Sequence, residues 1–410
     1  MLILALSFPG SKRLNAHITI TGSKSETNRI LLLQALYPNI SIENSSNSDD
    51  GEVMQKGLGV SHGEVDIHHA GTAMRFLTAF FAAQEGRAVL LTGSERMRQR
   101  PIRILVDALR HLGAEITYAG KEGYPPLQIR GRKLKGNRVK LPADVSSQYI
   151  SALCLIAPSL PNGLQIDLEG KITSVPYIKM TLGLLEQIGV ATTFKENRIT
   201  ILPVKTALPK TLVVESDWSA ASYFYSVMAL AELGSKIQLS TYSITSLQGD
   251  SLLQEIYRKL GVSTQFQNGT ILLEKIVGQL PDSVALDLSD APDIAQTLAV
   301  TCFGLGIEAH FTGLHTLPIK ETDRLAAMKK ELEKFGAAVK IDHESLYVGA
   351  SDTIKQGVSV ATYNDHRMAM AFAPLALREG LTICDAMVVS KSYPDFWKDL
   401  RKVGFEIAEV

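Results

Sequence analysis

The sequence contains very little cysteine. Cys154, Cys302 and Cys384 are its only cysteines among 410 residues, none lies in a Cys-x-x-Cys pair, and all have apolar neighbours. An odd count without paired spacing argues against a disulfide framework or a cysteine metal site. It favours buried thiols in a reducing compartment. We therefore expect a cytoplasmic protein.

The sequence also lacks an excess of charge and long apolar runs. Its 42 Lys and Arg residues balance 42 Asp and Glu residues, so bulk charge supports neither a nucleic-acid nor an anionic-membrane partner. No apolar run is long enough to span a bilayer. The apolar Met1–Leu6 has neither the basic region nor the cleavage site of a signal peptide, and we interpret it as a strand.

Three common catalytic signatures are missing as well. The sequence has no His-Glu-x-x-His, no Gly-x-Ser-x-Gly, and no Gly-x-Gly-x-x-Gly after a predicted strand. It therefore gives no reason to expect a metal site, an acyl-transfer nucleophile or a bound dinucleotide.

What the sequence does contain is a repeated alternation of short strands and helices, in a chain long enough for two or three domains. Several predicted helices end at a glycine directly after the last apolar residue, the position of a left-handed C-cap. These glycines are Gly113, Gly189, Gly261, Gly336 and Gly404. A short hydrophobic strand follows each of them. The pattern predicts repeated α/β units, about 65–70 residues long, and not one long sheet.

Polar and cationic residues precede several predicted helices, where backbone N–H groups attract anions. In Thr21–Arg29, Lys24 adds a point charge and Arg29 can bind a phosphate in bidentate fashion, although the spacing is not that of a nucleotide P-loop. In Ala70–Arg75, Gly71 lets a ligand approach the backbone and Thr72 is a plausible cap. Capped turns without a ligand explain both segments equally simply.

Three further groups in the first half of the chain have the same character. Arg96, Arg98 and Arg100 crowd together just before Pro101, which we expect at or near the first position of a helix. Such a cluster suits a solvated loop or a bound polyanion. Two further groups can bind a phosphate or hydroxyl, or simply cap helices. They are Ser146, Ser147 and Gln148, and Ser174 with Tyr177.

The second half of the chain has sharper candidates. Lys320 and Arg324 are four residues apart, and on one helical face they would repel each other unless an anion lay between them. Glu321 beside them could move a proton. His366 and Arg367 open an apolar helix, where their charge opposes the dipole and again suggests an anion. Lys391 is either similarly placed or an ordinary surface lysine.

Together, in this order and at these separations, the segments resemble the enolpyruvyl transferase family over nearly the whole chain. The resemblance is stronger to the shikimate-pathway branch than to the branch that acts on UDP-N-acetylglucosamine. That branch commonly carries a cysteine in its catalytic loop, and Arg96–Arg100 has none. A non-catalytic anion-binding protein and an RNA-end-processing relative are the alternatives from other classes.

The resemblance implies transfer of the enolpyruvyl group of phosphoenolpyruvate to the 5-hydroxyl of shikimate 3-phosphate, with release of phosphate. This reaction belongs to chorismate and aromatic amino-acid biosynthesis. It proceeds by addition and then elimination, and it implies no cofactor and no metal. The implied partners are these two small molecules, without nucleic acid or membrane, and the implied state is a monomer.

The resemblance also assigns roles to individual residues. Asp293 is the candidate base and Glu321 the candidate for proton transfer at C3, and Lys24 and His366 are further catalytic candidates; without the resemblance, Asp293 would be an ordinary helix cap. The expected ligands of shikimate 3-phosphate are Ser23, Lys24, Arg29, Ser146, Ser147, Gln148, Ser174, Tyr177, Asp293, Thr316 and Lys320. The expected ligands of phosphoenolpyruvate are Lys24, Gly71, Arg100, Gln148, Arg324, Arg367 and Lys391.

The implied α/β fold has two similar domains, each of three repeated βαβαββ units. The expected domains are residues 21–215, and residues 1–20 with 216–410, with the active site in a cleft between them that closes on binding. Four features depart from the family pattern: His69 replaces a usual Asn, Phe76 a usual Pro and Thr316 a usual Asn, and the segment from Asp50 to His69 is short. His69 and Phe76 are expected to border the phosphoenolpyruvate pocket, which the inhibitor glyphosate would occupy.

Overall fold

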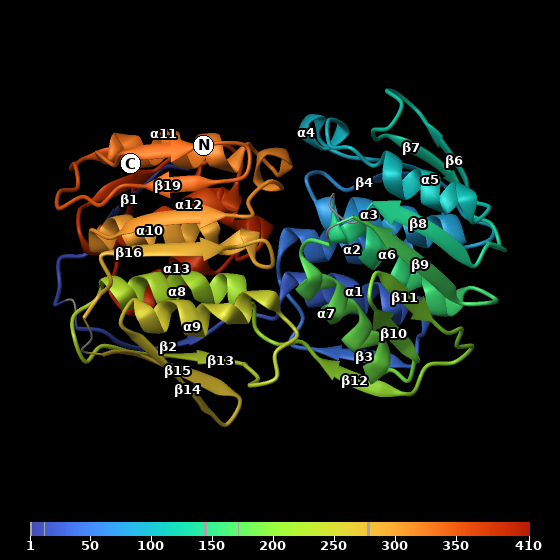
Figure 1. The fold of residues 1–410 in the computed structure, drawn as a ribbon, viewed down its shortest axis with the longest axis horizontal. Coiled ribbons are helices and arrows are strands. Elements are labelled where there is room, and N and C mark those ends of the chain that lie inside the picture. The colour runs from blue at the N-terminus through green and yellow to red at the C-terminus, as the bar shows by residue number, and fades with distance from the viewer. Residues whose placement is uncertain (1, 12, 143–145, 171, 277–278) are drawn as a thin grey trace. The chain divides into compact units, whose positions relative to one another are not determined.

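The chain divides into two compact units in the computed structural model, which describes residues 2–11, 13–142, 146–170, 172–276 and 279–410. The N-terminal unit comprises residues 23–214, drawn in blue to green in Figure 1. The C-terminal unit comprises residues 1–22 and 215–410, drawn mostly in yellow to red. Residues 1 and 12, in the predicted segment 1–20, lie outside the described residues.

The N-terminal unit contains two four-stranded sheets of the same topology, with orders β4-β5-β7-β6 and β10-β11-β9-β8. In each, the first two strands along the chain are parallel and the last two form an antiparallel hairpin. A third sheet pairs only β12 with β3, in parallel. The strands are β3(Ile40–Glu43), β4(His62–Asp66), β5(Ala88–Thr92), β6(Glu115–Tyr118), β7(Leu127–Arg130), β8(Arg138–Pro142), β9(Leu164–Glu169), β10(Thr192–Lys195), β11(Arg198–Ile201) and β12(Lys210–Val213).

The C-terminal unit contains three four-stranded sheets with that same strand arrangement, a parallel pair beside an antiparallel pair. Their orders are β20-β21-β1-β22, β14-β15-β13-β2 and β16-β17-β19-β18. The strands are β1(Leu4–Ser7), β2(Asn15–Thr19), β13(Lys236–Ser240), β14(Val262–Gln267), β15(Thr270–Lys275), β16(Ser283–Asp287), β17(Glu308–Thr312), β18(Val339–Ile341), β19(Leu346–Val348), β20(Val358–Val360), β21(Leu381–Ile383) and β22(Glu406–Glu409).

The first two strands of the chain belong to repeats that are completed near its other end. β1 is antiparallel to both β21 and β22, so it fills the inner hairpin position that β19 fills in its own sheet. β2 is parallel to β13, as β16 is to β17. The predicted strand in Met1–Leu6 is therefore present over Leu4–Ser7, and the C-terminal unit is built from both ends of the sequence.

The third repeat of the N-terminal unit is shorter than expected. Helix α2 (Asp49–Gly59) is followed after two residues by β4, so no hairpin separates them. This leaves β3 and β12 as a two-stranded sheet and explains why the segment from Asp50 to His69 is short. The expected repeat of βαβαββ units is thus present in both units, and the third repeat of the N-terminal unit lacks its hairpin.

Helices of two kinds cover the sheets. Helices such as α8 (Trp218–Leu230) and α12 (His366–Phe372) are buried on all sides, which is typical of a helix inside a core. Others, such as α5 (Arg103–His111) and α13 (Phe396–Val403), have one polar face. The remaining α-helices are α1(Lys24–Leu36), α3(Gly71–Ala83), α4(Glu95–Arg98), α6(Ser147–Ile156), α7(Val175–Gln187), α9(Leu253–Lys259), α10(Ala295–Leu305) and α11(Arg324–Lys334). Short 3-10 helices are η1(Ala157–Ser159), η2(Gly249–Leu252), η3(Pro292–Ile294), η4(Leu317–Ile319), η5(Ala373–Leu377) and η6(Ala386–Lys391).

The helix ends agree with the sequence better than the helix starts do. All five predicted C-cap glycines adopt positive φ, so this prediction is confirmed. Two predicted starts are wrong. The N-cap of α3 is Ala70 and no side chain caps it, so Thr72 is not a cap. The N-cap of α5 is Ile102, which places Pro101 before the helix, and Arg96 and Arg98 lie in the short helix α4 and not in a loop.

Candidate active site

Arg324 lies at the centre of a cluster of charged side chains in the C-terminal unit. It is the first residue of α11, and its side chain is 2% exposed. Its guanidinium donates to Asp293 Oδ1 at 2.8 Å, to Glu321 Oε2 at 3.0 Å and to Asp365 Oδ2 at 2.7 Å. Burial alone would lower the pKa of Arg324, but the three carboxylates outweigh it and raise that pKa.

The prediction that Lys320 and Arg324 share a helical face is wrong. Helix α11 begins only at Arg324, with Asp323 as its N-cap, and Lys320 follows the 3-10 helix η4. The two cations are nevertheless brought together, because both lie within reach of Asp293: Lys320 Nζ is 3.6 Å from its Oδ1. A shared carboxylate therefore offsets their repulsion.

Lys391 is not a surface lysine. Its side chain is 4% exposed, and its ammonium donates to Glu321 Oε1 at 2.8 Å. Glu321, itself 14% exposed, is thus held between Lys391 and Arg324, one cation at each oxygen. This geometry fixes the carboxylate in one orientation.

Asp293 is held by three cations. Besides Arg324 and Lys320, Arg367 Nη2 lies 3.3 Å from its Oδ2. Burial would raise the pKa of Asp293, but these cations outweigh burial and hold the pKa well below its ordinary value. Asp293 sits in η3, directly before α10. Because its pKa is so low, its carboxyl group is deprotonated at neutral pH.

The start of α12 already contains its own anion. Asp365 is the N-cap, and its carboxylate accepts from the backbone N–H of Arg367 at 2.9 Å and from the Arg324 guanidinium. His366 Nδ1 lies 3.6 Å from Asp365 Oδ1, and the imidazole is buried. The two cations in the first turn of α12 therefore do not by themselves require a bound anion, contrary to the sequence argument.

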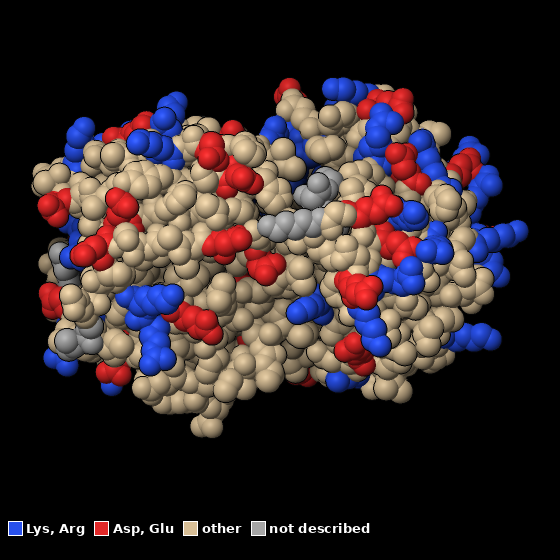
Figure 2. All heavy atoms as spheres, in the orientation of Figure 1, with Lys and Arg blue, Asp and Glu red and all other residues tan. Residues whose placement is uncertain are grey.

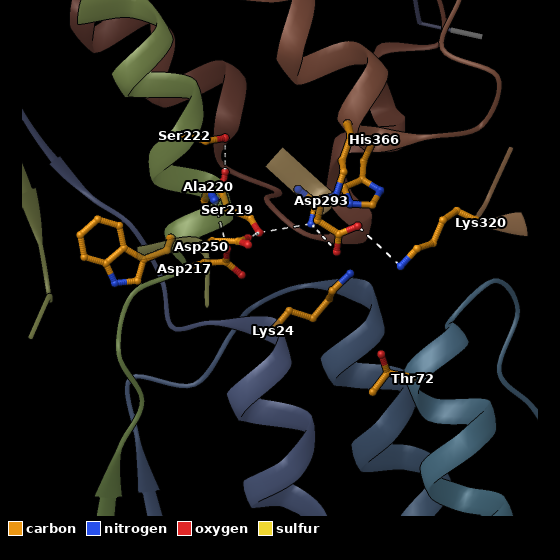
Figure 3. A network of polar contacts seen from close by, with 12 residues as sticks. Lys24, Thr72, Asp217, Ser219, Ala220, Ser222, Asp250, Asp293, Lys320 and His366 are labelled. Atoms are coloured by element: carbon orange, nitrogen blue, oxygen red, sulfur yellow. Dashed lines mark hydrogen bonds and ion pairs between the residues drawn. The ribbon is translucent and has the colours of Figure 1, made fainter. Parts of the chain in front are cut away.

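Figure 3 shows the side chains around Asp293: the Asp293 carboxylate faces Lys320, and His366 lies beside Asp293. Thr316, a further predicted ligand, is the N-cap residue of η4 without a side-chain capping bond. Its buried hydroxyl has no hydrogen-bond partner among the residues that the structure describes.

In the N-terminal unit, Gly71 and Arg100 depend on each other. A Cβ placed on Gly71 would lie 2.5 Å from Arg100 Nη1, so the guanidinium packs directly over the glycine backbone at the start of α3. Arg75, one turn into α3, instead donates to the carbonyl groups of Gly71 and Pro101 and acts as a structural tie. A side chain at position 71 would push the Arg100 guanidinium out of this place.

Ser23 and Lys24 begin α1. Ser23 is the N-cap, and its hydroxyl accepts from the N–H of Glu26. Lys24 Nζ lies 3.3 Å from Asp50 Oδ2, a carboxylate that is 3% exposed. Sequence reasoning missed Asp50, because it lies in the acidic first turn of α2, where an aspartate is common and gives no sign of a link to Lys24.

Arg29 is buried among helices. Its guanidinium donates to Thr181 Oγ1 at 2.8 Å, to Ser151 Oγ at 3.1 Å and to the carbonyl groups of Ser25 and Tyr177. Burial lowers the pKa of Arg29 to about 10, so it keeps its charge at neutral pH. This arrangement joins α1 to α6 and α7.

Phe76, one of the departures from the family pattern, is fully buried, and its ring lies 5.3 Å from the Arg29 guanidinium carbon. It is therefore a core residue that supports a predicted shikimate-phosphate ligand. His69, in contrast, is exposed.

The remaining predicted ligands of this unit lie at the starts of α6 and α7. Ser146 is the N-cap of α6 and accepts from the N–H of Gln148. Gln148 Nε2 donates to Thr72 Oγ1 at 3.2 Å, which places the starts of α3 and α6 side by side. Ser147 is buried beside them, and Ser174, with φ of 54°, precedes α7 and the partly buried Tyr177.

The structure thus gathers the predicted residues into two sets, one in each unit. Within the described ranges, no helix is long and apolar enough to cross a membrane, and no group of three or more His, Cys, Asp or Glu side chains could hold a metal ion. Acidic and basic side chains are interspersed over the face in Figure 2. The charge that could bind an anionic substrate is therefore concentrated locally, in these two sets of residues.

Comparison with known proteins identifies the family. Residues 60–400 match the model of the family described as EPSP synthase (3-phosphoshikimate 1-carboxyvinyltransferase). The chain belongs to this family. A protein named 3-phosphoshikimate 1-carboxyvinyltransferase from Bacteroides fragilis strain YCH46 is 44% identical over 399 residues, covering 96% of this chain and 97% of that protein. A protein of the same name from Shewanella piezotolerans is 36% identical over 426 residues, covering 96% and 98%.

Solved structures agree on the fold. An EPSP synthase from Acinetobacter baumannii has a TM-score of 0.79 at 21% identity, covering both chains completely. The enolpyruvyl transferase NikO from Streptomyces tendae has a TM-score of 0.75 at 13% identity, covering 100% of this chain and 99% of that one. The resemblance inferred from the motifs, the α/β fold class and the assignment to the transferases are thereby confirmed.

Proposed function

We propose that this chain transfers the enolpyruvyl group of phosphoenolpyruvate to the 5-hydroxyl of shikimate 3-phosphate and releases inorganic phosphate. The observation that carries the proposal is the cluster in the C-terminal unit. There, Asp293 and Glu321, the two carboxylates that the reaction needs, are each held by cations that could instead bind a substrate anion. Family membership supports the same reaction.

The pairing of these cations with Asp293 and Glu321 has a function if a substrate anion replaces the carboxylates as the partner of the cations. Without substrate, Lys320, Arg324 and Arg367 neutralise Asp293 and keep its pKa low, which makes it a weak base. A phosphate or carboxylate of phosphoenolpyruvate that takes over these cations would raise the pKa of Asp293. A base closer to the working pH accepts a proton more effectively.

The reaction then proceeds in two balanced steps. The 5-hydroxyl oxygen attacks C2 of phosphoenolpyruvate and gives its proton to Asp293. Glu321, which takes up a proton once a substrate anion has taken over Arg324 from its Oε2, gives that proton to C3, which becomes a methyl group. In the second step Glu321 takes a proton back from C3. The C2–O bond to phosphate breaks, and the phosphate leaves with the proton held by Asp293. Lys391, 2.8 Å from Glu321, stabilises the carboxylate form between the steps.

His366 and Lys24 have supporting roles in this proposal. His366 lies against Asp365, which in turn fixes Arg324, so its imidazole helps to hold the anion-binding cluster together. Lys24 can exchange Asp50 for a substrate phosphate, as the cations at Asp293 do. Lys24 adds positive charge where charge develops on the leaving phosphate.

The set in the N-terminal unit suits the phosphate and hydroxyl groups of shikimate 3-phosphate. Helices α1, α3 and α6 present their N-terminal ends with Ser23, Gly71 and Ser147, and such ends attract phosphate. The further ligands we propose for this substrate are Lys24, Arg29, Ser146, Gln148, Ser174 and Tyr177, with Asp293, Thr316 and Lys320 from the C-terminal unit. For phosphoenolpyruvate we propose Lys24, Gly71, Arg100, Gln148, Arg324, Arg367 and Lys391. The proposal requires both sets to act on the same pair of substrates. We further propose a monomer that works in the cytoplasm.

Phosphate release with two acceptors tests the proposal. The purified chain is incubated with phosphoenolpyruvate and either shikimate 3-phosphate or UDP-N-acetylglucosamine, and free phosphate is measured. We expect release only with shikimate 3-phosphate, and loss of most of that release in Asp293→Asn. Release only with the aminosugar nucleotide would assign the chain to the other branch. Binding of both substrates by calorimetry without any release would indicate a non-catalytic anion-binding protein.

A further inference from the structure

Asp250 is a buried carboxylate that the proposed reaction does not use. It lies in η2, before α9, and the residue is 4% exposed. One of its oxygens accepts a hydrogen bond from Ser219 Oγ, and its Oδ1 has no hydrogen-bond partner among the described residues. A buried carboxylate with so few partners is costly, so its position needs an explanation.

The hydrogen bond to Ser219 connects Asp250 to the proposed site. Arg367 Nη2 donates to the same Ser219 hydroxyl at 3.2 Å and lies 3.3 Å from Asp293 Oδ2. The four residues come from η2, α8, α12 and η3 and form one continuous polar chain, in which Figure 3 shows Asp250, Ser219 and Asp293 in sequence. All of them lie within the C-terminal unit.

Helix capping does not account for Ser219. The N-cap of α8 is Asp217, whose carboxylate accepts from the N–H of Ala220 at 3.0 Å. Ser219 is the one residue of α8 that is not fully buried, so packing does not account for it either. Its hydroxyl is instead placed where it can accept from Arg367 while donating to Asp250.

We propose that Asp250 is a positioning residue, whose carboxylate acts through the Ser219 hydroxyl to hold the Arg367 guanidinium against Asp293. The inference rests on the proposed function, in which Arg367 binds phosphoenolpyruvate. A negatively charged acceptor orients the Ser219 proton toward itself, which leaves the hydroxyl lone pairs for Arg367. Without that charge, Arg367 loses both an attractive partner and a fixed orientation.

The charge on Asp250 depends on pH in a useful range. Burial raises its pKa to about 6, with Arg367 and the Ser219 hydrogen bond opposing the rise and Asp293 and Asp217 adding to it. Asp250 is therefore charged above about pH 6 and becomes neutral as the pH falls through this value. We expect the hold on Arg367, and with it the affinity for phosphoenolpyruvate, to weaken over the same interval.

Steady-state kinetics of Asp250→Asn and Ser219→Ala test the inference between pH 5.5 and 8. At pH 7.5 we expect each variant to raise KM for phosphoenolpyruvate about tenfold, the effect of one hydrogen bond to a charged group, without changing KM for shikimate 3-phosphate. At pH 5.5 the difference between Asp250→Asn and the parent protein should largely disappear. The substrate phosphates titrate near pH 6 too, but equally for both proteins, so the comparison removes their effect.

Two matched controls separate the effect of the Asp250–Ser219–Arg367 chain, here called the relay, from a general loss of stability caused by removing a buried polar group. Asp399→Asn removes another buried carboxylate of the C-terminal unit, one that accepts from Tyr393 and pairs with Lys402. Ser222→Ala removes a buried hydroxyl one turn after Ser219. We expect both controls to keep the parent's KM for phosphoenolpyruvate and its pH profile.

Calorimetric titration of phosphoenolpyruvate alone, without shikimate 3-phosphate, gives the same information without turnover. Unchanged affinity in both Asp250→Asn and Ser219→Ala at pH 7.5, or a pH dependence in Asp250→Asn equal to that of the parent, would overturn the inference. An inactive parent protein would instead refute the proposed function, and the calorimetric comparison would still decide whether the relay exists. If Asp250→Asn does not fold, Ser219→Ala decides the matter.

Discussion

Replacing Arg324 by Met should destabilise the protein far more than the same change at the surface. Arg324 is 2% exposed and bonds to three carboxylates, so its loss removes one cation from each of them. Removing one partner from a buried ion pair costs about 3–5 kcal/mol. Arg103 is the matched control, since it pairs with Glu122 at 2.7 Å but is 50% exposed. An exposed pair contributes less than about 1 kcal/mol.

The assay is urea and thermal unfolding of both variants and the parent protein. For a domain of 150–250 residues, each kcal/mol lowers Tm by about 2–4 °C, so Arg324→Met should unfold about 6–20 °C lower and Arg103→Met within about 4 °C of the parent. The pH dependence has a definite sign. The low pKa of Asp293 stabilises the folded parent above the unfolded pKa, and this contribution is lost as the pH falls.

The difference in Tm between Arg324→Met and the parent should therefore become smaller below about pH 4, where the carboxylates of the variant are protonated. A Tm for Arg324→Met equal to that of Arg103→Met would refute the reasoning, as would a difference in Tm between Arg324→Met and the parent that stays the same from pH 7 to well below pH 4. Either result would mean that the charged cluster contributes nothing to the stability of the C-terminal unit.

Three further predictions follow from single contacts. Gly71→Ala should raise KM for phosphoenolpyruvate at least tenfold, because its Cβ would displace Arg100, whereas Gly59→Ala, with nothing within 4 Å, should leave KM unchanged in the same assay. Glu321→Gln should lower kcat about 10²–10⁴-fold with little change in substrate binding by calorimetry, and an unchanged kcat would remove Glu321 from the mechanism. Asp250→Asn should stabilise the fold above pH 6 by up to about 3 kcal/mol in urea unfolding, and not at all below pH 4, because only the charged form is penalised by burial. Equal stability of the two proteins at pH 7 would contradict this.

Local features of the fold were predictable from the sequence. A glycine after the last apolar residue of a helix adopts the left-handed conformation for reasons confined to a few residues, and Gly113 and Gly404 do so. The strand in Met1–Leu6 was also predictable. That β1 completes the sheet of β21 and β22 was not, because the pairing joins opposite ends of the chain.

The sequence was enough to predict which cations belong to the candidate site. It was not enough to predict which carboxylates pair with them. The sequence brings attention to Arg324 and Lys391 because they stand beside predicted helix starts. Asp365 and Asp293 lie 41 and 31 residues from Arg324 along the chain, so nothing local connects them to it. For the same reason the link from Ser219 to Asp250, over 31 residues, has no counterpart in any sequence pattern.

Mass spectrometry of the product formed in deuterium oxide tests the central claim most directly. Addition followed by elimination makes C3 of phosphoenolpyruvate a methyl group for part of the reaction, so solvent deuterium enters C3 before the vinyl group forms again. The account predicts an enolpyruvyl ether of shikimate 3-phosphate that carries deuterium on its vinyl carbon, together with one phosphate per ether. Formation of pyruvate and phosphate without an ether would contradict it, and so would an ether without deuterium at C3.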